Sequence, residues 1–213
     1  GVSGLWLLDG MAPDGVLTTI DVESELLGHA RRNFAAAGLS SHRTRLIAGR
    51  ALDVLPRMAA RGYDMVVLDG DLDETPQYLD HAVRILRPGG RYVIHELAMR
   101  PDSIGEEPAT EIRRALARAI NVNARPLTVA DWRRALEDVG LVVEETRMAP
   151  MALLKPGRLI ADEGARGALR IARNVARDKD LRERVTTMAR TFKKYDRHLC
   201  GVAIVARKPK ENQ

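Results

Sequence analysis

The stretch Val16-Leu-Thr-Thr-Ile-Asp21-Val-Glu23 decides how the rest of this sequence is interpreted. Its apolar and β-branched residues predict a short strand over residues 16–21, and residues 24–37 have the apolar spacing of a helix. An acidic side chain, Asp21, therefore stands where the strand ends. A carboxylate in that place can accept two hydrogen bonds from the cis-diol of a ribose, or it can simply cap the next helix.

The same alternation of strand and helix continues over the first hundred residues. Helices are expected over residues 3–11 and 51–61 and from Thr75 to the Pro88-Gly89-Gly90 turn, and strands over residues 46–48, 64–69 and 92–94. Residues 64–69 are almost wholly apolar, which is typical of a strand buried on both faces of a parallel sheet. The connections are long enough for right-handed crossovers, so the pattern predicts an α/β fold.

The second half of the chain has a different organisation. Residues 100–125 are polar and rich in arginine and alanine, which predicts a partly helical insertion. A capping box at Thr128 and Asp131 starts a helix that ends at Gly140. Helices are also expected over residues 158–176 and 179–196, and strands over residues 141–146 and 201–206. We predict one domain over residues 1–213, with residues 100–125 and 150–197 as helical lid elements.

Composition limits the classes of partner. The 213 residues, 45% of them hydrophobic, suffice for a sizeable core. The net charge of +5 is spread among acids and is not interleaved with aromatic residues, so no nucleic-acid partner is expected. No apolar run approaches the ~20 residues of a membrane span, so no membrane partner is expected either. The single cysteine, Cys200, and the lack of a visible secretory signal favour a cytoplasmic location.

The order of elements resembles that of class I S-adenosylmethionine-dependent methyltransferases. The matching stretches are Thr19-Ile-Asp21-Val-Glu23, Ala48-Gly-Arg-Ala51-Leu52-Asp53, Tyr63-Asp-Met-Val-Val-Leu-Asp69-Gly-Asp71 and Leu86-Arg-Pro-Gly-Gly90. The resemblance implies a Rossmann-like three-layer sandwich with a mostly parallel sheet, an antiparallel last strand and a helical insertion as a lid. Residues 1–88 are similar to catechol-type O-methyltransferases, whereas the chain from Gly90 onward is more similar to type-11 methyltransferases.

The resemblance also implies where S-adenosylmethionine binds. Asp21, followed by Val22, corresponds to the acid that binds the ribose hydroxyls, and Ala51 and Leu52 fall where the adenine ring is usually held. The Gly-rich loop that normally follows the first strand is reduced to Gly1-Val-Ser3-Gly4, and the first strand is missing from the sequence. Gly1 and Ser3 are nevertheless assigned to the cofactor site.

Two residues are candidates for the chemistry itself. Asp69 corresponds to an acid at the tip of the fourth strand, where the resemblance places both cofactor and acceptor; the alternative is a loop-start acid bonded to nearby amides. His95 follows an apolar strand and can act as a general base near neutral pH, although a structural histidine fits equally well.

The resemblance departs from the catechol type at its metal site. Those enzymes hold a divalent metal with acids where this chain has Asp69 and Asp71, but their Asp-Asn pair is here Glu96-Leu97. Leu72 also replaces the lysine that usually follows as general base. An oxygen-ligand magnesium site needs several well-placed oxygens, so no metal is expected.

The sequence thus predicts an enzyme that transfers a methyl group from S-adenosylmethionine to a small-molecule acceptor, with oxygen as the expected atom. Two alternatives stay open: a truncated or decayed methyltransferase-fold binding module without activity, and an NAD(P)-dependent Rossmann oxidoreductase. The missing Gly-x-Gly-x-x-Gly pattern stands against the second alternative. A homodimer is left open.

Overall fold

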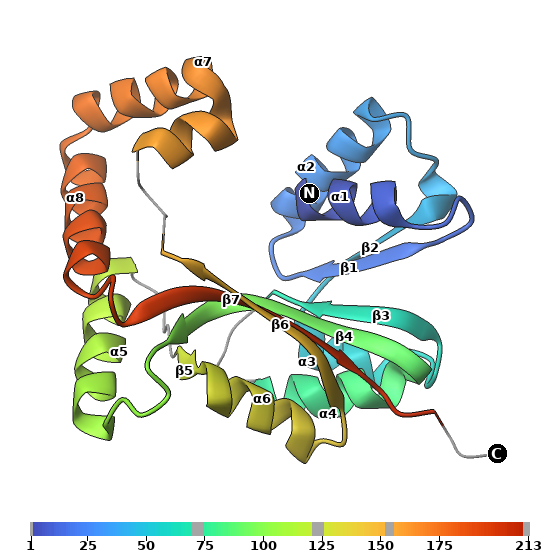
Figure 1. Ribbon diagram of the computed structural model, residues 1–213. Helices are drawn as coiled ribbons and strands as arrows, with labels where there is room; N and C mark the ends of the chain where they lie inside the picture. The colour runs from blue at the N-terminus through green and yellow to red at the C-terminus, as the bar shows by residue number, and fades with distance from the viewer. Residues whose placement is uncertain (1, 70–74, 121–125, 152–155, 211–213) are drawn as a thin grey trace. The chain divides into compact units, whose positions relative to one another are not determined.

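The computed structural model describes residues 2–69, 75–120, 126–151 and 156–210, which form two compact units. The first unit is Gly1–Gly62 and the second is Tyr63–Gln213. Each unit has its own β-sheet, as Figure 1 shows. The single domain over residues 1–213 stays a prediction. In the described residues, no helix is long and apolar enough to cross a membrane.

The first unit is built on two parallel strands. β1 (Leu17–Asp21) pairs with β2 (Thr44–Ala48), with Asp21 opposite Ala48. Its other elements are α1 (Val2–Gly10), α2 (Ser24–Ala36), the 3₁₀ turn η1 (Ser41–Arg43), α3 (Ala51–Val54) and the 3₁₀ turn η2 (Leu55–Arg57). The core gathers Leu8 of α1 with Ala30 and Phe34 of α2, all at most 3% exposed. The apolar face of α2 thus packs against α1.

The second unit contains a five-stranded sheet. Its strands are β3 (Tyr63–Leu68), β4 (Leu86–Met99), β5 (Leu127–Thr128), β6 (Val142–Pro150) and β7 (Leu199–Arg207). They are ordered β3-β4-β7-β6, and the short β5 pairs with the end of β4. β3 and β4 are parallel, whereas β7 is antiparallel to both of its neighbours. The prediction of a mostly parallel sheet with an antiparallel last strand is confirmed.

Helices α4 (Thr75–Ile85) and α6 (Val129–Asp138) lie along one face of this sheet (Figure 1). Their apolar sides and the sheet form the main core, whose fully buried members include Tyr92, Ile94, Trp132, Leu136 and Ile204. β4 places every second residue on this face, so Tyr92, Ile94, Glu96 and Ala98 share it.

A second core joins the helices that were predicted to form a lid. α5 (Glu106–Ile120) and α8 (Lys179–Lys194) pack against each other, and α7 (Pro156–Arg177) precedes α8 (Figure 1). Ile112 and Leu116 of α5 meet Phe192 of α8 and the strand residues Met99 and Leu199. The predicted insertions are therefore helical, and α5 and α8 are anchored to the ends of β4 and β7.

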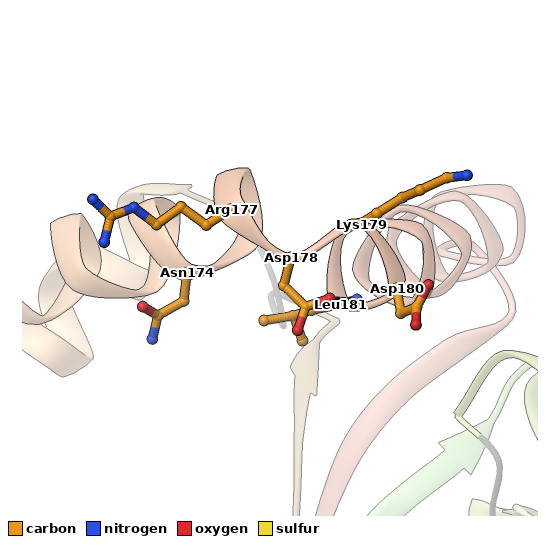
Figure 2. A pocket seen from close by; sticks show the side chains of 6 residues that line it. All are labelled: Asn174, Arg177, Asp178, Lys179, Asp180 and Leu181. Carbon is orange, nitrogen blue, oxygen red and sulfur yellow. Dashed lines mark hydrogen bonds between the residues drawn. The ribbon is translucent and has the colours of Figure 1, made fainter.

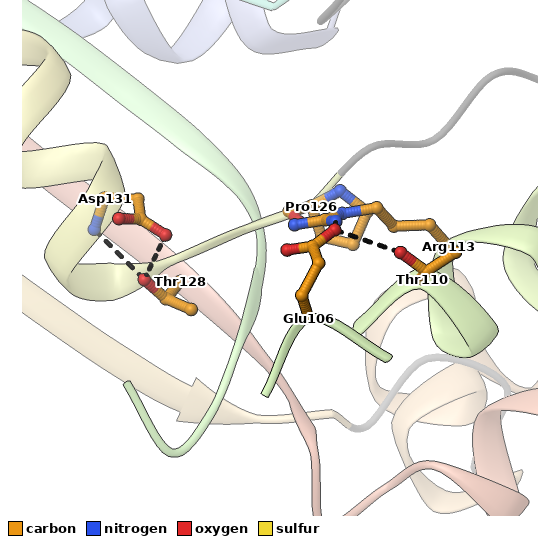
Figure 3. A network of polar contacts seen from close by, with 6 residues as sticks. All are labelled: Glu106, Thr110, Arg113, Pro126, Thr128 and Asp131. Atoms are coloured by element: carbon orange, nitrogen blue, oxygen red, sulfur yellow. Dashed lines mark hydrogen bonds and ion pairs between the residues drawn. The ribbon is translucent and has the colours of Figure 1, made fainter. Parts of the chain in front are cut away.

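The predicted capping box at Thr128 and Asp131 forms at the start of α6. The Thr128 hydroxyl accepts a hydrogen bond from the Asp131 amide at 3.1 Å and donates one to the Asp131 carboxylate at 2.8 Å (Figure 3). Asp131 thus holds the capping hydroxyl, while the Ala130 amide donates to Asp102 Oδ1 at 3.0 Å. Nearby, Arg113 and Thr110 bind Glu106 on α5, and Arg113 also reaches the carbonyl of Pro126 (Figure 3).

Two predicted boundaries are wrong. β4 begins at Leu86, so the Pro88-Gly89-Gly90 turn belongs to the strand. Gly89 N donates to Lys208 O and Lys208 N donates to Gly90 O, both at 2.9 Å, and these bonds pair the turn with the chain after β7. The helix predicted over residues 51–61 ends at Val54 and continues only as η2, because Pro56 has no amide hydrogen for a further α-helical bond.

Candidate active site

The first unit gathers the predicted cofactor residues at the carboxyl ends of β1 and β2. The Asp21 carbonyl accepts a hydrogen bond from Gly49 N at 2.9 Å, which ties the two strand ends together. Gly49 has φ +149°, a conformation that favours glycine, and it lets the chain turn from β2 toward α3. Ala51 and Leu52 are the first two residues of α3, so they lie at the same edge as Asp21 and Val22.

The Asp21 carboxylate closes a turn of its own chain. Its Oδ1 accepts a hydrogen bond from Glu23 N at 2.8 Å. It does not cap α2, because the N-cap residue of that helix is Glu23 and makes no side-chain cap bond. Within the described part of the chain, the second oxygen, Oδ2, has no hydrogen-bond partner. One oxygen therefore fixes the carboxylate and the other can accept a bond from a ligand.

The start of α3 offers two further groups to a ligand. The first amides of a helix have no intrahelical acceptor, and the N-cap residue Arg50 makes no side-chain cap bond. The amides of Ala51 and Leu52 can therefore donate to an adenine-like ring, and both side chains are half-buried. The residues at this edge fit a nucleoside with a cis-diol.

Of the remaining cofactor residues, Ser3 lies in the first turn of α1 and is exposed. The remnant of the Gly-rich loop is thus helical from Val2 onward. Gly4 has a packing role, since a Cβ there would lie 2.7 Å from Phe34 Cζ. Gly1 lies outside the described residues.

The second unit brings both predicted catalytic residues to one edge of its sheet. β3 and β4 run parallel with Leu68 opposite Ile94, so Asp69, which follows the carboxyl end of β3, lies level with His95. His95 does not follow its strand as predicted, because β4 continues to Met99. Both side chains are exposed. This edge is where open α/β sheets bind ligands. Among the described residues, no group of three His, Cys, Asp or Glu side chains could hold a metal ion, and Asp71 and Leu72 lie outside them.

Glu96 was noted in the sequence only as a departure from the metal-site pattern and was given no role there. It is half-buried on the core-facing side of β4, whereas His95 points to the opposite face. Burial raises the pKa of Glu96 to about 7; a hydrogen bond with the Leu97 backbone lowers it, and the negative charge of Asp69 raises it further. An acid in the apolar alternation Tyr92-x-Ile94-x-Glu96-x-Ala98 was the signal that could have revealed it.

Tyr92 adds a buried polar group to the same face. Its side chain is 0% exposed, and its hydroxyl has no hydrogen-bond partner among the residues that the structure describes. Burial raises the pKa of Tyr92, and the charge of Glu96 raises it further. The phenol of Tyr92 therefore stays protonated at neutral pH.

Two surface depressions lie in other parts of the second unit. One is at the junction of α7 and α8, lined by Asn174, Arg177, Asp178, Lys179, Asp180 and Leu181 (Figure 2). The other lies on α5, lined by Glu106, Glu107, Thr110, Glu111, Arg114 and Arg118. Neither is lined by Asp69, His95 or Glu96.

Comparisons with known proteins agree with the fold. A family model described as a methyltransferase domain matches residues 1–97. A Mycobacterium avium (strain 104) protein named "Putative O-methyltransferase" is 56% identical over 99 residues, 46% of this chain and 45% of that protein. A protein with the same name from Mycobacterium sp. (strain JLS) is 43% identical over 162 residues, 76% of this chain and 65% of that protein.

A solved structure is similar over almost the whole chain. It is "a putative sarcosine dimethylglycine methyltransferase from Galdieria sulphuraria", with a TM-score of 0.71 at 14% identity, covering 97% of this chain and 74% of that one. This likeness shows the fold. The chain spans 45% of the first mycobacterial relative and 65% of the second.

Proposed function

We propose that the protein is a class I S-adenosylmethionine-dependent methyltransferase that transfers a methyl group from S-adenosylmethionine to an oxygen atom of a small molecule. Its similarity to a methyltransferase-domain model over residues 1–97 and to the mycobacterial relatives supports this proposal. The names of both mycobacterial relatives support oxygen as the acceptor atom. The observation that carries the proposal is the edge formed by Asp21, Ala51 and Leu52, which offers a carboxylate oxygen and two helix-start amides to one nucleoside.

The cofactor residues have separate tasks in this proposal. The free oxygen of Asp21 accepts the ribose hydroxyls, while its bond to Glu23 N keeps the carboxylate in place. Val22, Ala51 and Leu52 border the adenine ring. Gly1, Ser3 and Asp69 are retained as cofactor-binding residues from the family resemblance. When bound, S-adenosylmethionine supplies the methyl group on its sulfonium, so catalysis consists mainly of positioning and desolvation.

Methylation of a hydroxyl group requires a residue that accepts the hydroxyl proton. A hydroxyl acceptor loses its proton as its oxygen takes the methyl group, and S-adenosylhomocysteine leaves. Asp69 and His95 are the candidates from the sequence, and Glu96, on the other face of β4 from His95, is a third candidate. A carboxyl group with a pKa near 7 can take such a proton at neutral pH.

Titration calorimetry with S-adenosylhomocysteine tests the cofactor assignment. Asp21→Asn keeps an oxygen for the Glu23 amide but removes the charge, so affinity should fall about ten- to hundredfold, as expected for a hydrogen bond to a charged group. The matched control is Asp14→Asn, in the exposed turn before β1, which should bind like the unchanged chain. Equal affinity in all three proteins would refute the role of Asp21, and no binding at all would refute the proposed function.

We also propose that the protein works in the cytoplasm, without a nucleic-acid partner, and that it forms a homodimer. The first two points rest on the single buried cysteine and on the dispersed charge of the chain. Light scattering coupled to size-exclusion chromatography tests the third, because a monomeric mass at all concentrations would exclude the dimer.

A further inference from the structure

The second half of α7 carries a stripe of arginines. After Gly164, whose φ of +69° bends the helix, Arg166, Arg170, Arg173 and Arg177 follow at intervals of four, three and four residues. Residues three and four apart in a helix lie on the same face, so the four guanidinium groups line one side. All four residues are exposed.

The described residues supply no partner for the charge of this stripe. Within the part of the chain that the structure describes, none of the four guanidinium groups takes part in a hydrogen bond or ion pair. The acids at the end of α7 point elsewhere: Figure 2 shows Arg177 directed away from the carboxylates of Asp178 and Asp180. Asp178 is also occupied, because its Oδ1 accepts from Leu181 N at 3.0 Å and caps α8.

An exposed apolar side chain lies beside the arginines. Leu169 is 72% exposed, three residues after Arg166 and immediately before Arg170. The inner side of the same helix is formed by Ile171 and Val175, which are half-buried. Leu169 therefore belongs to the outward side of α7 and has no role in the packing of that inner side. A large apolar side chain next to four cations suits a partner that is anionic at its surface and apolar beneath.

We propose that α7 binds the surface of a membrane that contains anionic phospholipids, with the four arginines on lipid phosphates and Leu169 at the boundary of the acyl chains. The expectation of no membrane partner came from the absence of a spanning segment, and a helix that lies on a membrane surface needs none. Nucleic acid fits less well, because α7 contains no aromatic side chain for base stacking and Leu169 would gain nothing. The proposal does not depend on methyl transfer.

Sedimentation of the 213-residue chain with vesicles tests this inference. The chain should bind vesicles of phosphatidylcholine mixed with phosphatidylglycerol, bind vesicles of phosphatidylcholine alone far more weakly, and lose binding as salt is raised. Each arginine is worth about fivefold in the partition coefficient, so Arg166→Gln with Arg170→Gln should lower it about 25-fold. Leu169→Gln should lower it at unchanged charge.

The control variant removes the same charge at the same spacing elsewhere. Arg114 and Arg118 are exposed and four residues apart on α5, among Glu107 and Glu111. Replacing both with Gln should change vesicle binding by less than about twofold, and circular dichroism confirms that each variant is folded. Equal losses in both double variants, equal binding to neutral vesicles, or tighter binding to an RNA duplex in the same buffer would overturn the proposal.

Discussion

Glu96 combines two properties that rarely occur together in a surface carboxyl group. It lies on the core-facing side of β4, between the buried residues Ile94 and Ala98, and it stands near a second carboxylate, Asp69. Both burial and a like charge favour the protonated form of an acid. The stability of the folded state should therefore depend on pH through Glu96.

Replacing Glu96 with Gln should change stability only where the wild-type side chain is ionised. The folded state raises the pKa of Glu96 above its ordinary value, so folding is favoured at low pH and this gain is lost between about pH 4.5 and pH 7. Glu96→Gln should match the wild type at pH 4 and exceed its stability by about 1–3 kcal/mol at pH 8. Urea unfolding at both pH values measures this, with the exposed Glu183→Gln as control. A variant less stable at pH 8 than the wild type would contradict it.

At the scale of elements, the sequence pattern correctly predicted those helices and strands whose bounds depend on neighbouring residues in the chain. β1, β3 and the start of α4 follow from apolar runs and from Thr75-Pro76, and the structure places them within one residue of the expectation. The start of β4 could not be foreseen, because it depends on bonds to Lys208, 122 positions away from Leu86. Glu96 was missed for a similar reason, since its burial depends on α4 and α6 packing under the sheet.

Two helical glycines of the first unit should respond to alanine in opposite ways. Gly4→Ala would put a Cβ 2.7 Å from the buried ring of Phe34, and overpacking of this kind costs about 1–3 kcal/mol. Gly28, inside α2, has only Arg32 Nη1 nearby at 3.7 Å, so Gly28→Ala should stabilise by about 0.5–1 kcal/mol. Thermal unfolding of the two variants measures both effects. A stabilising Gly4→Ala would show that Phe34 can move aside.

The contact between α5 and α8 should weaken at low pH. The Tyr195 hydroxyl donates to Glu111 Oε1 at 2.6 Å, and Lys194 Nζ donates to the same oxygen at 3.0 Å. The hydrogen bond from Tyr195, followed by that from Lys194, lowers the pKa of Glu111, so this stabilisation is present above the ordinary pKa and is lost as the pH falls through the lowered one.

Tyr195→Phe should therefore lower the melting temperature at pH 7, and the difference from the wild type should shrink at pH 3. Calorimetry at the two pH values checks this. The control is Lys193→Met, at an exposed position in the last turn of α8. A difference that is the same at both pH values would mean that Tyr195 acts only through packing in the second core.

For the whole molecule, the cofactor decides among the three functional hypotheses. S-adenosylhomocysteine at about 100 times its dissociation constant stabilises a folded state that binds it by about 2.7 kcal/mol, or about 5–10 °C in melting temperature. We expect that shift with S-adenosylhomocysteine and none with NAD. A shift with NAD alone would favour an oxidoreductase, and no shift with either would favour a binding module.

The antiparallel strand at the centre of the larger sheet has a consequence for how the chain is made. β7 lies between β4 and β6, yet it leaves the ribosome after the other four described strands of this sheet. About a hundred residues separate Met99 from Leu199. At a synthesis rate of about 5–20 residues per second, the edge of β4 that pairs with β7 therefore stays unpaired for about 5–20 s. The internal contacts of the first unit, in contrast, join residues that are at most about 60 positions apart. We therefore expect a chaperone to bind the exposed edge of β4 during synthesis.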